Sequence, residues 1–141
     1  MQLLAISDLH LSQTSNKEAL IKMADHRDDW LIIGGDTSEK PELHEFAFKE
    51  LSKRFGRLIW VPGNHDLWTF DSKSKYAKRG VEKYNMLVEI ARSFGVITPE
   101  DPFLEWPEKS GNDAESLFIA PLFLLYDYSF RPQSVDRNNV K

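Results

Sequence analysis

An asparagine, a histidine and an aspartate stand together at residues 64–66, directly after a short apolar run at residues 58–61. The run has the length and composition of a buried strand. The Pro-Gly pair that follows ends it, because proline cannot donate to a ladder and glycine tolerates a turn. Amide, imidazole and carboxylate groups suit metal ligation and proton transfer. The segment therefore predicts a chemical role for the loop after this strand.

Two earlier apolar runs end in side chains of the same kind. Residues 2–7 lead into Asp8 and His10, and residues 30–33 lead into two glycines and Asp36. Asp8 and His10 alternate around a leucine, so both can point to one side of an extended segment. The glycines allow a close approach of backbone where Asp36 is presented.

Helical spacing separates these three runs. We expect one helix across residues 15–24, residues 25–29 as a polar connection, and a second helix from Pro41 to Gly56. Alternation of strand and helix within about sixty residues is typical of right-handed parallel βαβ units. The apolar face of the second helix is assigned to Leu43, Phe46, Ala47, Leu51 and Phe55.

Parallel strands would bring the polar side chains together. In open α/β sheets the loops beyond the carboxyl ends of the strands form the ligand crevice. Taken singly, the aspartates could be helix caps and the Asn-His pair could be turn chemistry. Together they favour a metal site, and mixed oxygen and imidazole ligands favour Mn, Fe or Zn over calcium. The side chains concerned are Asp8, His10, Asp36, Asn64 and His65.

The motifs D-x-H at residues 8–10, G-D at residues 35–36 and G-N-H-D at residues 63–66 resemble the first three motifs of the calcineurin-like metallophosphoesterase family. Their order, spacing and position at strand ends all agree with it. The resemblance implies an α/β fold, with a metallophosphoesterase-like βαβαβ sheet and flanking helices, as an incomplete version of the family's two-sheet sandwich. It also implies metal-dependent hydrolysis of a phosphate monoester or diester by metal-activated water.

The resemblance also implies roles for single residues. Asp8, His10 and Asp36 would hold one divalent ion, and Asp36 would bridge to a second ion that Asn64 also binds. His65 would be the general acid and Asp66 would orient it. Two such ions can clamp the attacking and leaving oxygens of an in-line displacement. A neighbouring imidazole suits protonation of an alkoxide leaving group.

One departure from the family is plain. The family pattern continues with a further histidine and a G-H-x-H motif, whereas this chain has four histidines and none after His65. We therefore expect residues 1–141 to be a single domain that corresponds to the N-terminal portion of a longer phosphoesterase, or to a shortened relative. The alternative function is a non-catalytic binding or scaffold module with an incomplete metal site. A plain nucleotide-binding domain is disfavoured, since no glycine-rich phosphate loop is present.

The second half of the chain offers weaker signals. Lys73, Lys75 and Arg79 belong to a basic stretch that could attract a phosphate group. A helix is expected to end at Gly95, with a fourth strand at residues 96–97 and a hairpin from residues 103–106 and 117–125. His26 and His44 are expected to be solvated.

Composition limits the remaining possibilities. The chain has 141 residues, 41% of them hydrophobic, a net charge of -4 and no cysteine, which excludes disulfides and thiolate metal sites. Nothing indicates a membrane span or signal peptide, and nucleic acid is not specifically indicated. We expect a cytoplasmic protein. A homo-oligomer or a second chain could cover the apolar residues near the C-terminal end.

Overall fold

The computed structural model describes residues 1–69, 77–107, 116–124, 132–134 and 136. In chain order its elements are β1 (Leu3–Ile6), α1 (Thr14–Ile21), β2 (His26–Ile33), α2 (Pro41–Leu51), β3 (Phe55–Trp60), the 3-10 turn η1 (His65–Leu67), α3 (Gly80–Ser93), β4 (Leu104–Glu105) and β5 (Phe118–Ile119).

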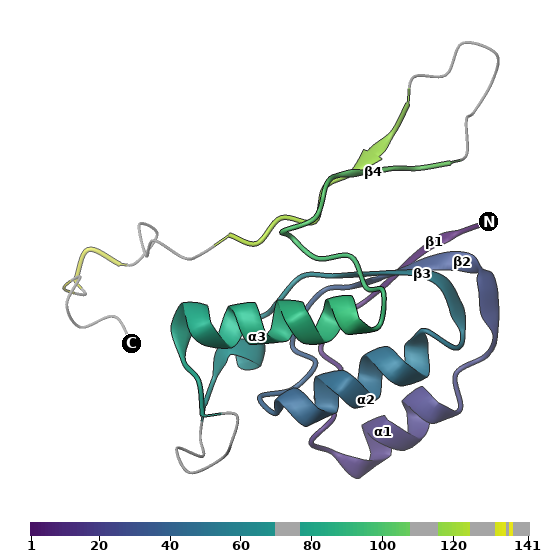
Figure 1. Cartoon of the computed structure of the whole chain (residues 1–141). Coiled ribbons are helices and arrows are strands. Elements are labelled where there is room, and N and C mark those ends of the chain that lie inside the picture. The colour runs from purple at the N-terminus through teal and green to yellow at the C-terminus, as the bar shows by residue number, and fades with distance from the viewer. Residues whose placement is uncertain (70–76, 108–115, 125–131, 135, 137–141) are drawn as a thin grey trace.

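A three-stranded parallel sheet in the order β1-β2-β3 forms the centre of the fold. All three helices lie along the same side of it (Figure 1). The expected fourth strand is reduced to a bridge between Ile97 and Ile59. There the Trp60 N–H donates to Ile97 O at 2.8 Å. The α/β class and the parallel sheet are confirmed.

The core fills the space between the sheet and the helices. On β2 and β3 the alternate residues Leu31, Ile33, Leu58 and Trp60 are buried against helical side chains. Trp60 and Phe48 of α2 are fully buried, with ring centroids 6.0 Å apart. The sheet and α2 are therefore fixed to each other close to the strand ends that carry the polar loops.

The other face of the sheet is partly covered by aromatic and cationic groups. Trp30 is half-buried, with the Trp106 ring at 5.2 Å edge-on and the Arg57 guanidinium at 5.6 Å. Trp106 follows β4, which pairs antiparallel with β5. The expected hairpin is confirmed, although each strand is only two residues long.

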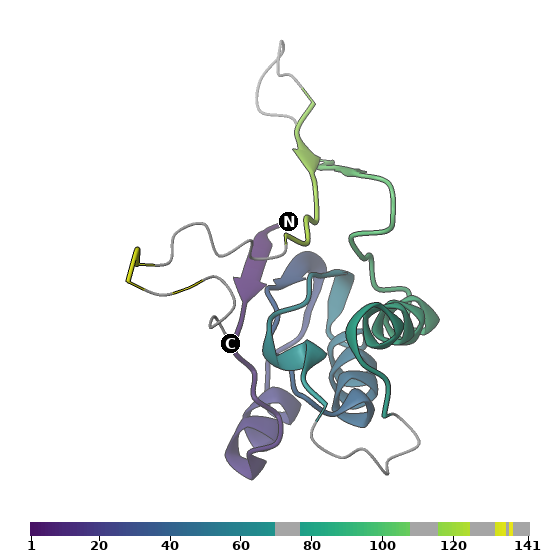
Figure 2. The same cartoon turned by 90° about the vertical axis from the view of Figure 1, so that its left-hand side faces the viewer.

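This hairpin extends away from the sheet in both views (Figures 1 and 2). Its position leaves several large apolar side chains with more than half of their surface exposed. Covering of this region by another chain stays a prediction, and residues 125–131 lie outside the described part. The exposed side chains are Phe103, Leu117, Phe118, Leu122 and Leu124.

Three expected boundaries are wrong. The first helix ends at Ile21 and not at residue 24. Residues 26–29 belong to β2, because the His26 ring stacks on Phe55 at 5.3 Å and starts the pairing with β3. The second helix ends at Leu51, and Gly56 lies inside β3 instead of ending a helix. A Cβ on Gly56 would meet Arg27 O at 2.5 Å, so glycine allows the close approach of neighbouring strands there.

Candidate metal centre

Three acidic and imidazole side chains converge where β1 and β2 end. Asp8, His10 and Asp36 each offer one ligand atom, and these atoms all lie within 4.8 Å of one another. Ligands on opposite sides of an ion with bonds of about 2.1 Å are about 4.2 Å apart, so small side-chain rotations suffice to reach one ion. Two carboxylates and one imidazole are a donor set that divalent transition metals accept. The three residues fit a metal ion.

The backbone at all three residues is in the left-handed region. The φ angles are +56° at Asp8, +41° at His10 and +51° at Asp36, and no other non-glycine residue in the described part has a positive φ. This conformation costs free energy in non-glycine residues and persists only where surrounding contacts impose it. Within the described residues this conformation is confined to the three candidate ligands among the non-glycine residues.

Hydrogen bonds between the loops impose that conformation. The β1–α1 loop runs beside the β2–α2 loop and continues the pairing of their strands. The His10 N–H donates to Asp36 O at 3.0 Å, and the Leu11 N–H donates to Thr37 O at 3.0 Å. Asn16 at the start of α1 donates from its amide to Leu9 O at 2.9 Å.

The loop after β3 packs directly onto Asp36. The His65 N–H donates to Asp36 Oδ1 at 3.0 Å. A Cβ on Gly63 would meet Asp36 N at 2.6 Å, and a Cβ on Gly35 would meet Gly63 Cα at 2.6 Å. Gly35 also has a φ of +82°. Both glycines are therefore required where these two loops touch.

This loop brings His65 to the candidate ligands. Its ring is 4.9 Å from the His10 ring, edge-on, and 3.8 Å from the Trp68 ring. His65 is half-buried, and Asn64 before it is exposed. Five residues predicted from the sequence thus lie at one edge of the sheet, on three different loops. They are Asp8, His10, Asp36, Asn64 and His65.

The Asp66 side chain points into the protein and accepts hydrogen bonds from backbone N–H groups. Its buried carboxylate accepts hydrogen bonds from the Ser38 N–H at 3.1 Å, the Gly63 N–H at 2.9 Å and His44 Nε2 at 3.0 Å. These contacts lead to the β2–α2 loop and to α2, and orientation of His65 by Asp66 stays a prediction. Asp66 thus fixes the distance between the two loops that meet at Asp36.

His44 is fully buried, so the expectation that it is solvated is wrong. Its ring lies 6.0 Å from both the Phe48 and the Trp60 rings. On a helical wheel of 3.6 residues per turn, position 44 lies only about 20° from Leu51, so it already falls within the apolar face assigned to the second helix. A histidine at such a position indicates a buried polar contact.

Lys83 of α3 was also missed by the sequence analysis. It is buried, and its ammonium group donates to the carbonyl oxygens of Glu39, at 2.8 Å, and of Trp68. Burial lowers the pKa of Lys83, and the nearby charges of Asp66 and Glu39 oppose that shift. The lysine joins α3 to the loops on both sides of the site.

The predicted basic group is only partly described. Lys73 and Lys75 lie outside the described residues, and Arg79 is exposed immediately before α3. Contact of these residues with phosphate stays a prediction.

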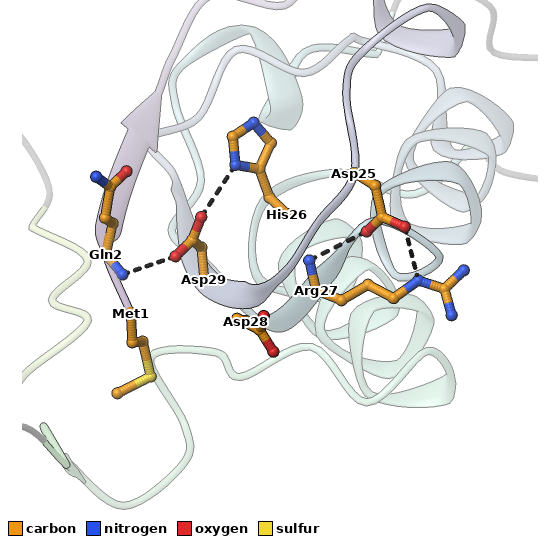
Figure 3. Close-up of a pocket in the computed structure, with 7 residues that line it drawn as sticks. All are labelled: Met1, Gln2, Asp25, His26, Arg27, Asp28 and Asp29. Atoms are coloured by element: carbon orange, nitrogen blue, oxygen red, sulfur yellow. Dashed lines mark hydrogen bonds and ion pairs between the residues drawn. The ribbon is translucent and has the colours of Figure 1, made fainter.

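A polar cavity lies at the opposite edge of the sheet (Figure 3). Most of its ionisable side chains pair with one another: Asp29 accepts from His26 Nδ1 at 3.0 Å and also from the Gln2 N–H at 2.7 Å, and Arg27 Nε donates to Asp25 at 3.0 Å. His26 is half-buried in this arrangement instead of fully solvated. Because most of these ionisable groups already have partners within the cavity, it is a weaker candidate than the carboxyl edge.

The fold and the residues at the carboxyl edge of the sheet define a class of protein. It comprises α/β proteins whose parallel sheet carries a candidate divalent-metal site beyond the carboxyl ends of its strands. Comparison with known families matches residues 1–124 to the calcineurin-like phosphoesterases, and the chain belongs to that family. The resemblance found in the sequence motifs is confirmed.

A curated relative is 41% identical over 133 residues, which is 94% of this chain and 40% of the relative. It is the [acyl-carrier-protein] phosphodiesterase PptH of Mycobacterium tuberculosis. The crystal structure of phosphopantetheinyl hydrolase (PptH) from the same organism matches with a TM-score of 0.83 at 40% identity, over 96% of this chain and 47% of that one. The chain thus spans less than half the length of these relatives.

No helix in the described segments is long and apolar enough to cross a bilayer.

Gly63→Ala should disrupt the site, because the added methyl group would collide with Asp36. We expect the free energy of unfolding to fall by about 1–3 kcal/mol or more, as for an overpacked core. The matched control is Gly34→Ala, whose methyl group would find its nearest neighbour at 3.4 Å. Urea denaturation of both variants measures the difference, and equal stability of the two would contradict the proposed packing of the loops.

Proposed function

We propose that this chain carries the metal-binding half of a phosphoesterase active site and that it belongs to an enzyme that hydrolyses phosphoesters in a metal-dependent reaction. The observation that carries this proposal is the convergence of Asp8, His10 and Asp36 in left-handed backbone at the carboxyl edge of the sheet. Membership of the calcineurin-like phosphoesterase family supports the reaction class.

Asp8, His10 and Asp36 would hold one divalent ion, and Asp36 with Asn64 would hold a second, with Mn, Fe or Zn as the expected metals. Bound divalent ions supply charge neutralisation at phosphorus and a water of lowered pKa. The protein's own contribution is preorganisation. The His65 N–H already donates to Asp36 Oδ1, so the carboxylate that the two ions would share and the loop that carries His65 keep one relative position.

His65 would donate a proton to the leaving oxygen as general acid. Its imidazole contacts the His10 and Trp68 rings, which restricts its rotation, and it stays partly exposed. A group that protonates a substrate atom must be accessible in this way. Asp66 contributes by holding the loop that carries His65.

The substrate is proposed to be a phosphodiester of phosphopantetheinyl-acyl carrier protein. This rests on the 41% identity to a relative that is named an acyl-carrier-protein phosphodiesterase. Lys73, Lys75 and Arg79 would attract the phosphate or the acidic face of such a partner. We expect a cytoplasmic location, and the family match across residues 1–124 supports one domain.

A second candidate is a non-catalytic binding module that keeps the fold. The observation in its favour is that all four histidines lie at or before position 65, so the later histidines of the family pattern are missing from these residues. Metal binding without hydrolysis would distinguish this candidate from the enzyme.

Asp36→Asn should abolish Mn²⁺ binding, because it removes the charge of the shared ligand while keeping its shape. Isothermal titration with Mn²⁺ measures this, and hydrolysis of phosphopantetheinyl-acyl carrier protein should be lost in parallel. Asp28→Asn, at the exposed opposite edge of the sheet, is the control and should bind Mn²⁺ as the unaltered chain does. Equal Mn²⁺ affinity of the Asp36→Asn variant and the unaltered chain would refute the metal site.

His65→Ala should keep Mn²⁺ affinity but lower the rate of hydrolysis by roughly a hundred-fold or more for an alkyl phosphodiester. With a p-nitrophenyl diester the loss should be smaller, because that leaving group needs little protonation. The comparison of the two substrates isolates the acid role. An equal loss on both would assign His65 to metal or phosphate binding instead.

A further inference from the structure

His44 and Asp66 form a buried pair next to the loops that present the candidate metal ligands, and neither is itself a candidate ligand or the general acid. Both side chains have no exposed surface, and His44 Nε2 is 3.0 Å from Asp66 Oδ1. A buried ionisable pair is costly to desolvate and is a weak source of stability compared with apolar packing. Its presence under the site calls for another explanation.

The hydrogen bonds of the pair provide one. Asp66 accepts from the N–H groups of Ser38 and Gly63, which stand two residues after Asp36 and one residue before Asn64. The same carboxylate therefore holds both loops that present candidate metal ligands. With only two backbone donors, its remaining acceptor capacity would be buried and unsatisfied, and His44 supplies the third donor.

His44 is itself fixed in direction. Its Nδ1 lies 3.2 Å from Lys40 O, one helical turn earlier, and its ring packs against Phe48 and Trp60. The imidazole therefore has little freedom to turn, and its Nε2 stays aimed at Asp66. Helix α2 is linked in this way to both loops that present candidate metal ligands.

We propose that His44 is a positioning residue for the metal centre: through Asp66 it sets the separation of the Asp36 loop and the loop of residues 63–66. The inference deepens the proposed function and rests on it for the consequence at the metal. The link from His44 through Asp66 to the two N–H groups stands on the geometry alone.

Two substitutions of His44 separate this role from simple packing. The amide nitrogen of His44→Gln reaches the position of Nε2 and can still donate to Asp66, whereas that of His44→Asn reaches only the position of Nδ1 and Lys40 O. Both leave a smaller polar side chain in the same apolar surroundings. The matched control is His26→Gln, because His26 contacts Asp29 at 3.0 Å through Nδ1, a position that a glutamine amide does not reach, at the opposite edge of the sheet.

The first readout needs no metal. Amide hydrogen exchange of Ser38 and Gly63, followed by NMR on the metal-free chain, should be about ten-fold faster or more in His44→Asn. In His44→Gln and His26→Gln it should stay close to the unaltered chain. Unchanged exchange in His44→Asn, or an equal increase in the His26→Gln control, would overturn the proposal.

The second readout is Mn²⁺ affinity at a temperature where every variant is folded. We expect roughly ten-fold weaker binding or more for His44→Asn, rescue by His44→Gln and no change for His26→Gln. If even the unaltered chain binds no Mn²⁺, the proposed function fails, while the exchange experiment still decides the role of His44. Altered exchange without altered affinity would overturn the link to the metal centre.

His44→Asn could fail to fold, and the unaltered chain then carries the test. Its His44 Nε2–H, buried and bonded to Asp66, should give a ring N–H signal protected from exchange with water. A His44 Nε2–H signal that exchanges as freely as a solvated histidine would overturn the proposal.

Discussion

The contact between Asp36 and Gly63 is the constraint on which the rest of the site depends. Two loops from neighbouring strands meet there so closely that a single methyl group would not fit. The approach brings the His65 N–H onto the Asp36 carboxylate and sets His65 beside His10. Asp36 would be the ligand shared by two ions, and the loop that carries His65 packs against the same residue. The position of His65 relative to the metal centre therefore depends on Asp36.

Buried groups of the helices help to explain how the loops after β1, β2 and β3 keep their shape. Left-handed backbone at three non-glycine residues needs contacts that outweigh its cost. Part of these contacts is the backbone ladder between the first two loops. The rest comes from the helices: His44 of α2 reaches the loops through Asp66, and Lys83 of α3 holds two of their carbonyl oxygens. Helical rigidity is transmitted to the site through buried polar groups.

The parallel sheet and the polar residues at its carboxyl edge could be predicted from the sequence because both follow from local signals. Apolar runs of strand length that end in glycine and polar residues locate the strand ends, and parallel order then brings Asp8, Asp36 and His65 together. The supporting layer was missed because it depends on tertiary contacts. Lys83 is a polar residue on a helix, and only the packing of α3 under the loops shows that it is buried. The helical wheel places His44 on the apolar face of α2, but its partner Asp66 follows only from the packing of α2 against the loops. Gly56 was misplaced for the same reason, since its role is a close approach between strands.

The most direct test of this account is a crystal of the chain soaked in Mn²⁺, with anomalous diffraction recorded at the manganese edge. The account predicts an anomalous peak bonded by Asp8, His10 and Asp36 at the carboxyl edge of the sheet. An empty carboxyl edge, with Mn²⁺ bound instead at the acidic residues 25–29 on the opposite edge, would contradict it.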